Sequence, residues 1–236
     1  MILKNLVLSG GQIKGLCYAG VIKAMEEMDL MSNLENILGV SSGAIFAFGI
    51  AIGLSGDQII RILEYLTLDN LRDINTENIL IFDETLGIDT CNKFCRLFKI
   101  ICKKIIGKSD ATFSDLKEKN PKYNLMIAGA NITHKKLDIF SHENTPDMPV
   151  WLAIRISMTV PIYFTKICFN DCYYVDGGVI DNYPIYLFDE DIENTLGIML
   201  TDPSTGKNLD NIGQYMYRIM DCLLARMSDY LKEKYK

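Results

Sequence analysis

Histidine is scarce in this chain, whose 236 residues contain only His134 and His142. Both lie in the polar stretch 131–146, where a surface histidine is ordinary, so neither is a strong candidate for a chemical role. Basic residues are also fewer than acidic ones. The chain has 24 Lys and Arg residues against 30 Asp and Glu, which gives a net charge of −6. Nucleic-acid binders normally carry a basic field, so this balance argues against nucleic acid as a partner.

Neither a leader segment nor a membrane-spanning apolar run is expected from the sequence. Residues 1–9 resemble a short strand rather than a charged region followed by a long apolar one, so no signal peptide is expected. The stretch 36–56 carries no charge and is nearly long enough to span a bilayer, but it contains five glycines. A strand, a sharp turn and a buried helix explain it better than a transmembrane helix. We therefore expect a cytoplasmic or intracellular protein.

The seven cysteines are an odd number, and a chain of this length needs no disulfides, so reduced thiols are the simpler interpretation. Cys91 and Cys95 lie four residues apart, as do Cys168 and Cys172. These pairs could form a four-cysteine zinc site, but the spacing is a weak signal. Cys91, Cys95 and Cys102 fit better as small apolar residues on a helix face. We expect no metal and no other cofactor.

The order of predicted elements indicates an α/β protein. A buried strand over 4–9, a glycine-rich turn and a helix over 16–28 form the opening of a parallel α/β unit. Further strands are predicted at 36–40, 123–130, 136–140 and 194–200, a hairpin around Asn170-Asp171, and helices at 42–54, 57–68, 89–107, 150–158 and 208–235. No repeat or linker divides the chain. We expect one domain over 1–236, with its core at about 4–200 and a C-terminal helix.

A candidate nucleophile lies between the second predicted strand and the helix after it. Gly39-Val40-Ser41-Ser42-Gly43 has the G-x-S-x-G spacing of a nucleophile elbow, in the strand–turn–helix context that this motif requires. The flanking glycines let neighbouring backbone pass close by, and the helix N-terminus favours a developing oxyanion. Ser41 is the central serine. The alternative is a chance match, because glycine and serine are common in turns.

A serine hydroxyl needs a base, and an aspartate is the better candidate here. In α/β-hydrolases the order is serine, acid, histidine, whereas both histidines of this chain precede the best acid. That acid is Asp176, which follows an apolar-aromatic strand and precedes Gly177-Gly178. The alternative is an ordinary Asp-Gly turn.

The first turn, at Gly10-Gly11-Gln12, offers backbone N–H groups at a helix N-terminus. Such a turn can hold a phosphate or an oxyanion. The glycine spacings of dinucleotide-binding and P-loop proteins are both absent. An oxyanion is therefore favoured if Ser41 is the nucleophile.

Taken in order, these motifs resemble those of the patatin-like phospholipases. The first turn is similar to the family's G-G-G-x-[KR]-G oxyanion motif, residues 39–43 to its elbow, and Asp176-Gly177-Gly178 to its D-G-G. Residues 153–161 and 181–185 also resemble the segments that flank the D-G-G. The similarity covers about residues 4–200, and three ordered motifs are far more specific than one.

The resemblance implies a three-layer α/β/α fold with a mainly parallel sheet and a Ser41–Asp176 dyad. It assigns the oxyanion hole to the N–H groups of Gly10, Gly11 and Gln12. Gln12 departs from the family pattern, which has a third glycine there. If this position requires a positive φ, its Cβ causes strain. The implied activity is hydrolysis of phospholipid or other acyl-lipid esters through an acyl-enzyme.

Two alternatives to a lipid hydrolase stay open. One is a catalytically weak relative that binds lipid or protein, and the other is a thioesterase or transacylase. The segment 90–108 predicts a basic amphipathic helix, with six Lys or Arg residues and no acid, which could lie peripherally on an anionic membrane. We favour the simpler interpretation, a surface helix whose apolar stripe faces the core.

Overall fold

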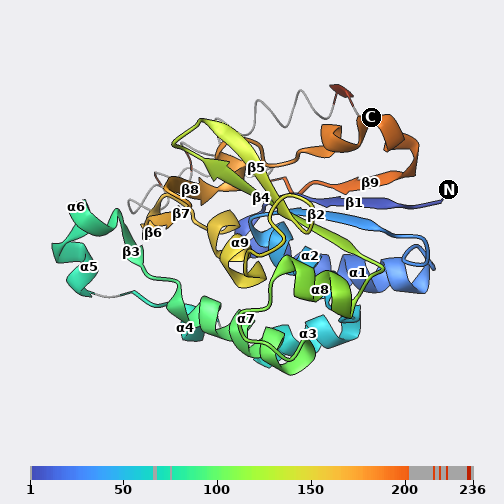
Figure 1. Cartoon of the computed structure of the whole chain (residues 1–236), viewed down its shortest axis with the longest axis horizontal. Coiled ribbons are helices and arrows are strands. Elements are labelled where there is room, and N and C mark those ends of the chain that lie inside the picture. The colour runs from blue at the N-terminus through green and yellow to red at the C-terminus, as the bar shows by residue number, and fades with distance from the viewer. Residues whose placement is uncertain are drawn as a thin grey trace.

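The computed structural model describes residues 2–65, 68–74 and 76–201, together with positions 215, 218, 222, 233 and 234. One mixed seven-stranded sheet runs through the described part of the chain, and helices pack against it (Figure 1). The predicted C-terminal helix over 208–235 lies outside the described residues, apart from the isolated positions.

Four neighbouring strands of the sheet run parallel, and the last of them lies at its edge. In spatial order they are β4 (Asn124–Asn131), β2 (Asn36–Val40), β1 (Asn5–Leu8) and β9 (Thr195–Ile198). The antiparallel strands are β5 (Lys136–Ser141), β7 (Ile167–Phe169) and β8 (Cys172–Asp176). The predicted hairpin is confirmed: Asn170 and Asp171 join β7 to β8 with φ values of 47° and 59°, as a two-residue type I′ turn requires.

Both faces of the central strands are covered. The helices on one face are α1 (Cys17–Glu27), α2 (Ser42–Ala51) and α9 (Val150–Ser157). Leu6 and Leu8 of β1 point into the core that these helices share, whereas Val7 packs with Tyr183 and Ile185 on the other face, where the 3-10 segment η3 (Ile185–Asn194) begins. Burial on both faces explains why the parallel strands are apolar at nearly every position. The predicted α/β/α layering is confirmed.

Strand β8 meets the end of β2 along one edge of β4. β2 runs parallel to β4 and ends with Val40 paired to Ala128. β8 runs antiparallel to β4, and its last residue, Asp176, pairs with Gly129. The two strands therefore point at each other along β4, and the residue that follows Val40 arrives where β8 ends.

Asparagines fix the strand register at the end of the sheet where the parallel strands begin, which is opposite to the end that carries Ser41. Asn5, Asn36 and Asn124 are paired across β1, β2 and β4. The Asn124 amide donates to the Asn36 carbonyl oxygen at 3.3 Å, and the Asn36 amide donates to that of Asn5 at 2.8 Å. The Asn5 amide in turn donates to Thr195 on β9 at 3.1 Å. A slip of one residue would break this chain of hydrogen bonds, so it opposes other registers.

The segment between α2 and β4, here called the excursion, contains more helices and strands than the sequence predicts. It contains α3 (Gly56–Tyr65), α4 (Leu68–Leu71), α5 (Thr76–Leu80), α6 (Phe82–Thr85), β3 (Gly87–Asp89), α7 (Asn92–Ile105) and α8 (Phe113–Lys119). β3 pairs with β6 (Ile162–Phe164) in a separate two-stranded sheet. The predicted helix over 89–107 therefore begins later, at Asn92, because residues 87–89 are extended.

The basic helix α7 packs its apolar side against the protein. Phe98 and Cys102 are buried, and Phe94, Ile101 and Ile105 pack against the same core. The interpretation as a core stripe is therefore correct, and this stripe does not face outward. Residues 36–56 form β2 and a buried α2, as predicted. Within the described residues, no helix is long and apolar enough to cross a membrane.

Candidate functional site

Ser41 occupies a strained turn between β2 and α2. Its φ of 53° and ψ of −123° are uncommon for any residue other than glycine, so the surrounding structure must hold it in place. The backbone N–H of Ser41 donates to the Ser157 hydroxyl at 2.8 Å. The helix that follows begins at Ser42, so the turn lies at a helix N-terminus, as the motif predicts.

The two glycines of the elbow are required by close packing. A Cβ on Gly39 would lie 2.5 Å from the Ala44 Cα, and one on Gly43 would lie 2.3 Å from the Leu8 carbonyl oxygen. Helix α2 thus folds back over its own strand and against the end of β1. The steric role predicted for both glycines is confirmed.

Asp176 lies within hydrogen-bond distance of Ser41. The Ser41 hydroxyl donates to Oδ2 of Asp176 at 2.5 Å, and the Gly178 N–H donates to Oδ1 at 2.8 Å. The N–H of Asp176 donates to the Thr159 carbonyl at 2.7 Å. Gly177 passes so close to β4 that a Cβ there would lie 2.7 Å from the Ala128 carbonyl oxygen. A backbone N–H thus holds the carboxylate at Oδ1, which leaves Oδ2 to face the Ser41 hydroxyl.

Burial changes the acidity of this carboxyl group. Ser41 and Asp176 are only 7% and 4% exposed. Desolvation raises the pKa of Asp176 from 3.8 to about 6, although hydrogen bonds from Ser41 and Gly178 act in the opposite direction. An aspartate with a pKa near 6 is a stronger base than an ordinary one, yet it is still ionised at neutral pH.

Two groups that hold this pair had no role assigned from the sequence. The Ser157 hydroxyl and the Thr159 carbonyl come from the end of α9, and they accept the N–H groups of Ser41 and Asp176. The buried Arg155 donates to the Thr159 hydroxyl and, at 2.9 Å, to the Thr165 carbonyl. The only signal in the sequence was the resemblance of residues 153–161 to the segment before a D-G-G.

The first turn lies against the elbow. A Cβ on Gly10 would lie 3.0 Å from the Ser41 Cβ, so the Gly10 backbone is next to the serine. The Gly11 N–H donates to the Ser42 hydroxyl at 3.0 Å. The N–H groups of Gly10 and Gln12 donate to no acceptor within the described part of the chain. Two of the three predicted donors therefore have no acceptor in the described residues, whereas the third is engaged.

Gln12 has the left-handed backbone conformation in which its Cβ is expected to cause strain. Its φ is 52°, in the left-handed region where a Cβ is unfavourable, and its side chain is exposed. Asn182, another residue without a role assigned from the sequence, donates to the Gly10 carbonyl at 3.0 Å. Asn182 therefore joins the segment after the D-G-G to the first turn.

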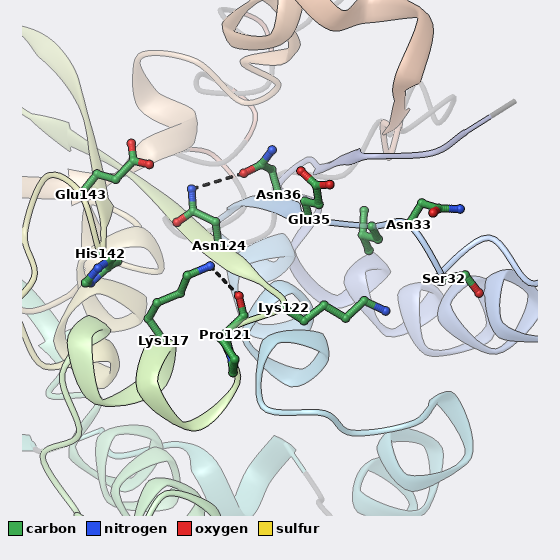
Figure 2. Close-up of a pocket in the computed structure, with 11 residues that line it drawn as sticks. Ser32, Asn33, Glu35, Asn36, Lys117, Pro121, Lys122, Asn124, His142 and Glu143 are labelled. Atoms are coloured by element: carbon green, nitrogen blue, oxygen red, sulfur yellow. Dashed lines mark hydrogen bonds between the residues drawn. The ribbon is translucent and has the colours of Figure 1, made fainter.

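The two histidines do not contact the pair. His134 is exposed in the turn after β4, where its N–H donates to Asn131. His142 lines a polar pocket of about 580 Å³ together with Asn36, Lys117 and Asn124 (Figure 2). Asn36 begins β2 and Ser41 follows the end of that strand, so the pocket and the pair are separated by roughly 16 Å along the strand.

No three His, Cys, Asp or Glu side chains in the described residues gather in a way that could hold a metal ion. Cys91 and Cys102 are buried, whereas Cys168 is exposed on β7 and Cys172 is half-buried on β8. The two cysteine pairs thus belong to different elements, α7 and the β7–β8 hairpin.

Comparisons with known proteins identify several relatives of this chain. The "Probable lipid hydrolase 463L" of Invertebrate iridescent virus 6 is 36% identical over 186 residues, which cover 77% of this chain and 62% of that protein. The "Uncharacterized protein R571" of Acanthamoeba polyphaga mimivirus is 32% identical over 197 residues, covering 83% and 65% respectively. The chain thus spans slightly less than two-thirds of the length of these relatives.

Among solved structures, VipD from Legionella pneumophila matches with a TM-score of 0.66 and 21% identity, covering 98% of this chain and 56% of VipD. That likeness concerns the fold. Residues 6–189 match the sequence profile described as patatin-like phospholipase. This match includes both members of the hydrogen-bonded pair, and the chain therefore belongs to the patatin-like phospholipase family.

Proposed function

We propose that this chain is a lipid acyl hydrolase that cleaves fatty-acyl esters, with Ser41 as nucleophile and Asp176 as general base. The observation that carries the proposal is the buried 2.5 Å hydrogen bond from the Ser41 hydroxyl to the Asp176 carboxylate. A pKa of about 6 for Asp176 supports proton transfer at neutral pH. Membership of the family, and a relative described as a probable lipid hydrolase, support a lipid substrate.

The proposed reaction has two steps. Ser41 Oγ attacks the ester carbonyl carbon while Asp176 Oδ2 takes its proton, and Asp176 returns that proton to the departing alcohol, which leaves an acyl group on Ser41. Water then attacks the acyl-enzyme. Asp176 takes the proton of this water and returns it to Ser41 Oγ as the fatty acid leaves.

The oxyanion would be stabilised at the first turn. The N–H groups of Gly10 and Gln12 have no competing acceptor in the described residues, and Gly10 lies against Ser41. The Gly11 N–H would join them only if it left the Ser42 hydroxyl, which it contacts at 3.0 Å. Each donor of this kind typically contributes about 10²–10³ to kcat.

Two observations favour an alternative function. The positive φ of Gln12 and the engaged Gly11 N–H both suit a weak enzyme that acts mainly as a lipid- or protein-binding module. A thioesterase or transacylase would use the same dyad. A panel of phospholipid, triacylglycerol and thioester substrates separates these activities.

The decisive experiment is covalent labelling with a fluorophosphonate, detected by intact-protein mass. The wild-type chain is expected to gain one label, and Ser41→Ala none. The double variant His134→Gln/His142→Gln is the matched control and is expected to label at the wild-type rate. A folded double-histidine variant that no longer labels would show that the base is a histidine. A folded wild-type chain that never labels would favour the binding module.

A further inference from the structure

Five large apolar side chains are exposed on one short segment of the excursion. They are Ile74, Ile79, Leu80, Ile81 and Leu86, here called the apolar platform. Their exposed fractions range from 43% for Ile81 to 86% for Leu80. Single exposed apolar residues are ordinary, but a group concentrated in residues 74–86 indicates a surface that contacts something else.

The platform is held in a defined position. The buried Asp89 accepts the N–H groups of Asp73 at 2.9 Å and Cys91 at 2.7 Å, at the two ends of the segment. Its own carbonyl accepts the Thr165 N–H at 2.9 Å, and the Lys166 N–H donates to the Thr85 carbonyl at 2.9 Å. These contacts, together with the pairing of β3 and β6, present the apolar side chains on a fixed scaffold.

The same contacts connect the platform to the candidate active site. β6 follows the end of α9, where Ser157 and Thr159 hold the backbones of Ser41 and Asp176. Figure 1 shows α5, α6 and β3 projecting beyond the carboxyl ends of the parallel strands. Ser41 follows the carboxyl end of β2. The platform thus lies at the end of the sheet that carries the dyad.

We propose that the apolar platform docks the protein on the surface of a zwitterionic lipid bilayer. This inference rests on the proposed function, because a lipid hydrolase must meet its substrate in an aggregate. Glu77, Asp83 and Glu84 are exposed among the apolar residues, and residues 72–93 contain five acidic residues against two basic ones, Arg72 and Lys93. Such a surface inserts apolar side chains but is repelled by anionic headgroups.

The basic helix α7 is a poorer candidate for docking than the platform. Its apolar stripe packs in the core, and Lys99 is paired with Asp110 at 3.0 Å and lies over the Trp151 ring. Lys93 donates to the Arg72 carbonyl at 2.6 Å. The two surfaces are expected to respond to anionic lipid in opposite ways. Anionic lipid would strengthen vesicle binding through α7, whereas it would weaken vesicle binding through the platform.

The test is co-sedimentation of the full chain with phosphatidylcholine vesicles, with and without added phosphatidylserine. Ser41→Ala is expected to bind phosphatidylcholine, which keeps binding separate from turnover. Ile79→Ser/Leu80→Ser is expected to bind at least about tenfold more weakly, because burial of even one such side chain contributes that much. Met28→Ser is the matched control, since Met28 is 67% exposed at the end of α1 and lies outside the platform. Added phosphatidylserine is expected to reduce binding.

Three results would overturn the docking proposal. The first is that the double serine variant binds vesicles as tightly as the wild type. The second is that binding increases with phosphatidylserine. The third is that the wild type is a dimer in solution and the double serine variant is a monomer. Fluorophosphonate labelling distinguishes the docking proposal from the proposed dyad, because labelling needs no lipid surface. The double serine variant and the wild type are expected to label equally. Loss of vesicle binding with normal labelling supports docking, and absence of labelling in the wild type counts only against the dyad.

Discussion

The hydroxyl oxygen of Ser157 accepts a hydrogen bond from the backbone N–H of Ser41 at 2.8 Å. Both residues are buried, and the contact restrains a serine whose φ is 53°. Two residues further on, the Thr159 carbonyl accepts the N–H of Asp176 at 2.7 Å. The end of α9 thereby positions the backbones of both candidate catalytic residues, although it contributes no reacting atom.

Ser157→Ala is expected to lower the free energy of unfolding by about 1–3 kcal/mol, because the buried N–H of Ser41 loses its acceptor. It is also expected to lower kcat by tenfold or more, since small misplacements of a nucleophile are costly. Ser141→Ala is the matched control: Ser141 is buried and accepts the Asn144 N–H at 3.2 Å, but it ends β5 near the amino ends of the parallel strands. Chemical denaturation and esterase assays compare them. Equal kcat values would contradict the positioning role.

The activity of the dyad is expected to depend on pH through Asp176. Burial raises the pKa of Asp176 to about 6, and only the ionised carboxylate accepts the Ser41 proton. For a soluble short-chain ester, kcat/KM is therefore expected to rise about tenfold per pH unit below pH 6 and to level off above it. Circular dichroism over the same range serves as the control for folding. A flat profile from about pH 4.5 to pH 8 would exclude Asp176 as the base.

Asp176→Asn is expected to stabilise the protein at neutral pH while removing activity. Because the folded-state pKa, about 6, is above the ordinary 3.8, the native state binds the extra proton. The free energy of unfolding is therefore highest below about pH 4 and falls as the pH rises through 6. Asn removes this penalty, so the free energy of unfolding of the variant is expected to exceed that of the wild type by about 3 kcal/mol at pH 8 and by little near pH 4.

Asp138→Asn is a control variant that is expected to change the free energy of unfolding in the opposite direction. Burial acts to raise the pKa of Asp138, but hydrogen bonds from Asn131, Lys136 and Tyr174 outweigh it and lower that pKa. Its ionised form stabilises the fold, so the variant is expected to lose stability at neutral pH and to match the wild type in acid. If urea denaturation showed Asp176→Asn to be less stable than the wild type at about pH 8, as is expected for Asp138→Asn, the folded-state pKa of Asp176 would not be raised.

Gln12→Gly is expected to keep or raise kcat, because the N–H stays and the φ of 52° suits glycine. The free energy of unfolding is expected to rise by up to about 1 kcal/mol, since relief of strain exceeds the entropy that glycine adds to the unfolded chain. Gln12→Asn, which tolerates the left-handed region and also keeps the N–H, is the matched control. A folded Gln12→Gly variant with much lower activity would assign the function to the glutamine side chain instead.

Much of the local structure could be predicted from the sequence, because it depends on neighbouring residues. The strand–turn–helix at 36–51 follows from apolar runs and from Gly39 and Gly43, whose Cβ atoms would clash. The excursion at 68–91 was largely missed. Its short helices carry no long apolar period, and they are held by remote contacts such as those of Asp89 with Thr165.

The candidate groups can be identified along the chain without a structure: Ser41 in its elbow, Asp176 before two glycines, and an N–H-rich turn at Gly10. Only the tertiary structure brought them together, because Ser41 and Asp176 are separated by 135 positions and meet where β2 and β8 converge along β4. The acidity of Asp176 is likewise a tertiary property, since its pKa depends on the amount of protein that excludes water. A pattern along the chain specifies donors and acceptors, whereas distance and burial arise from packing between remote segments.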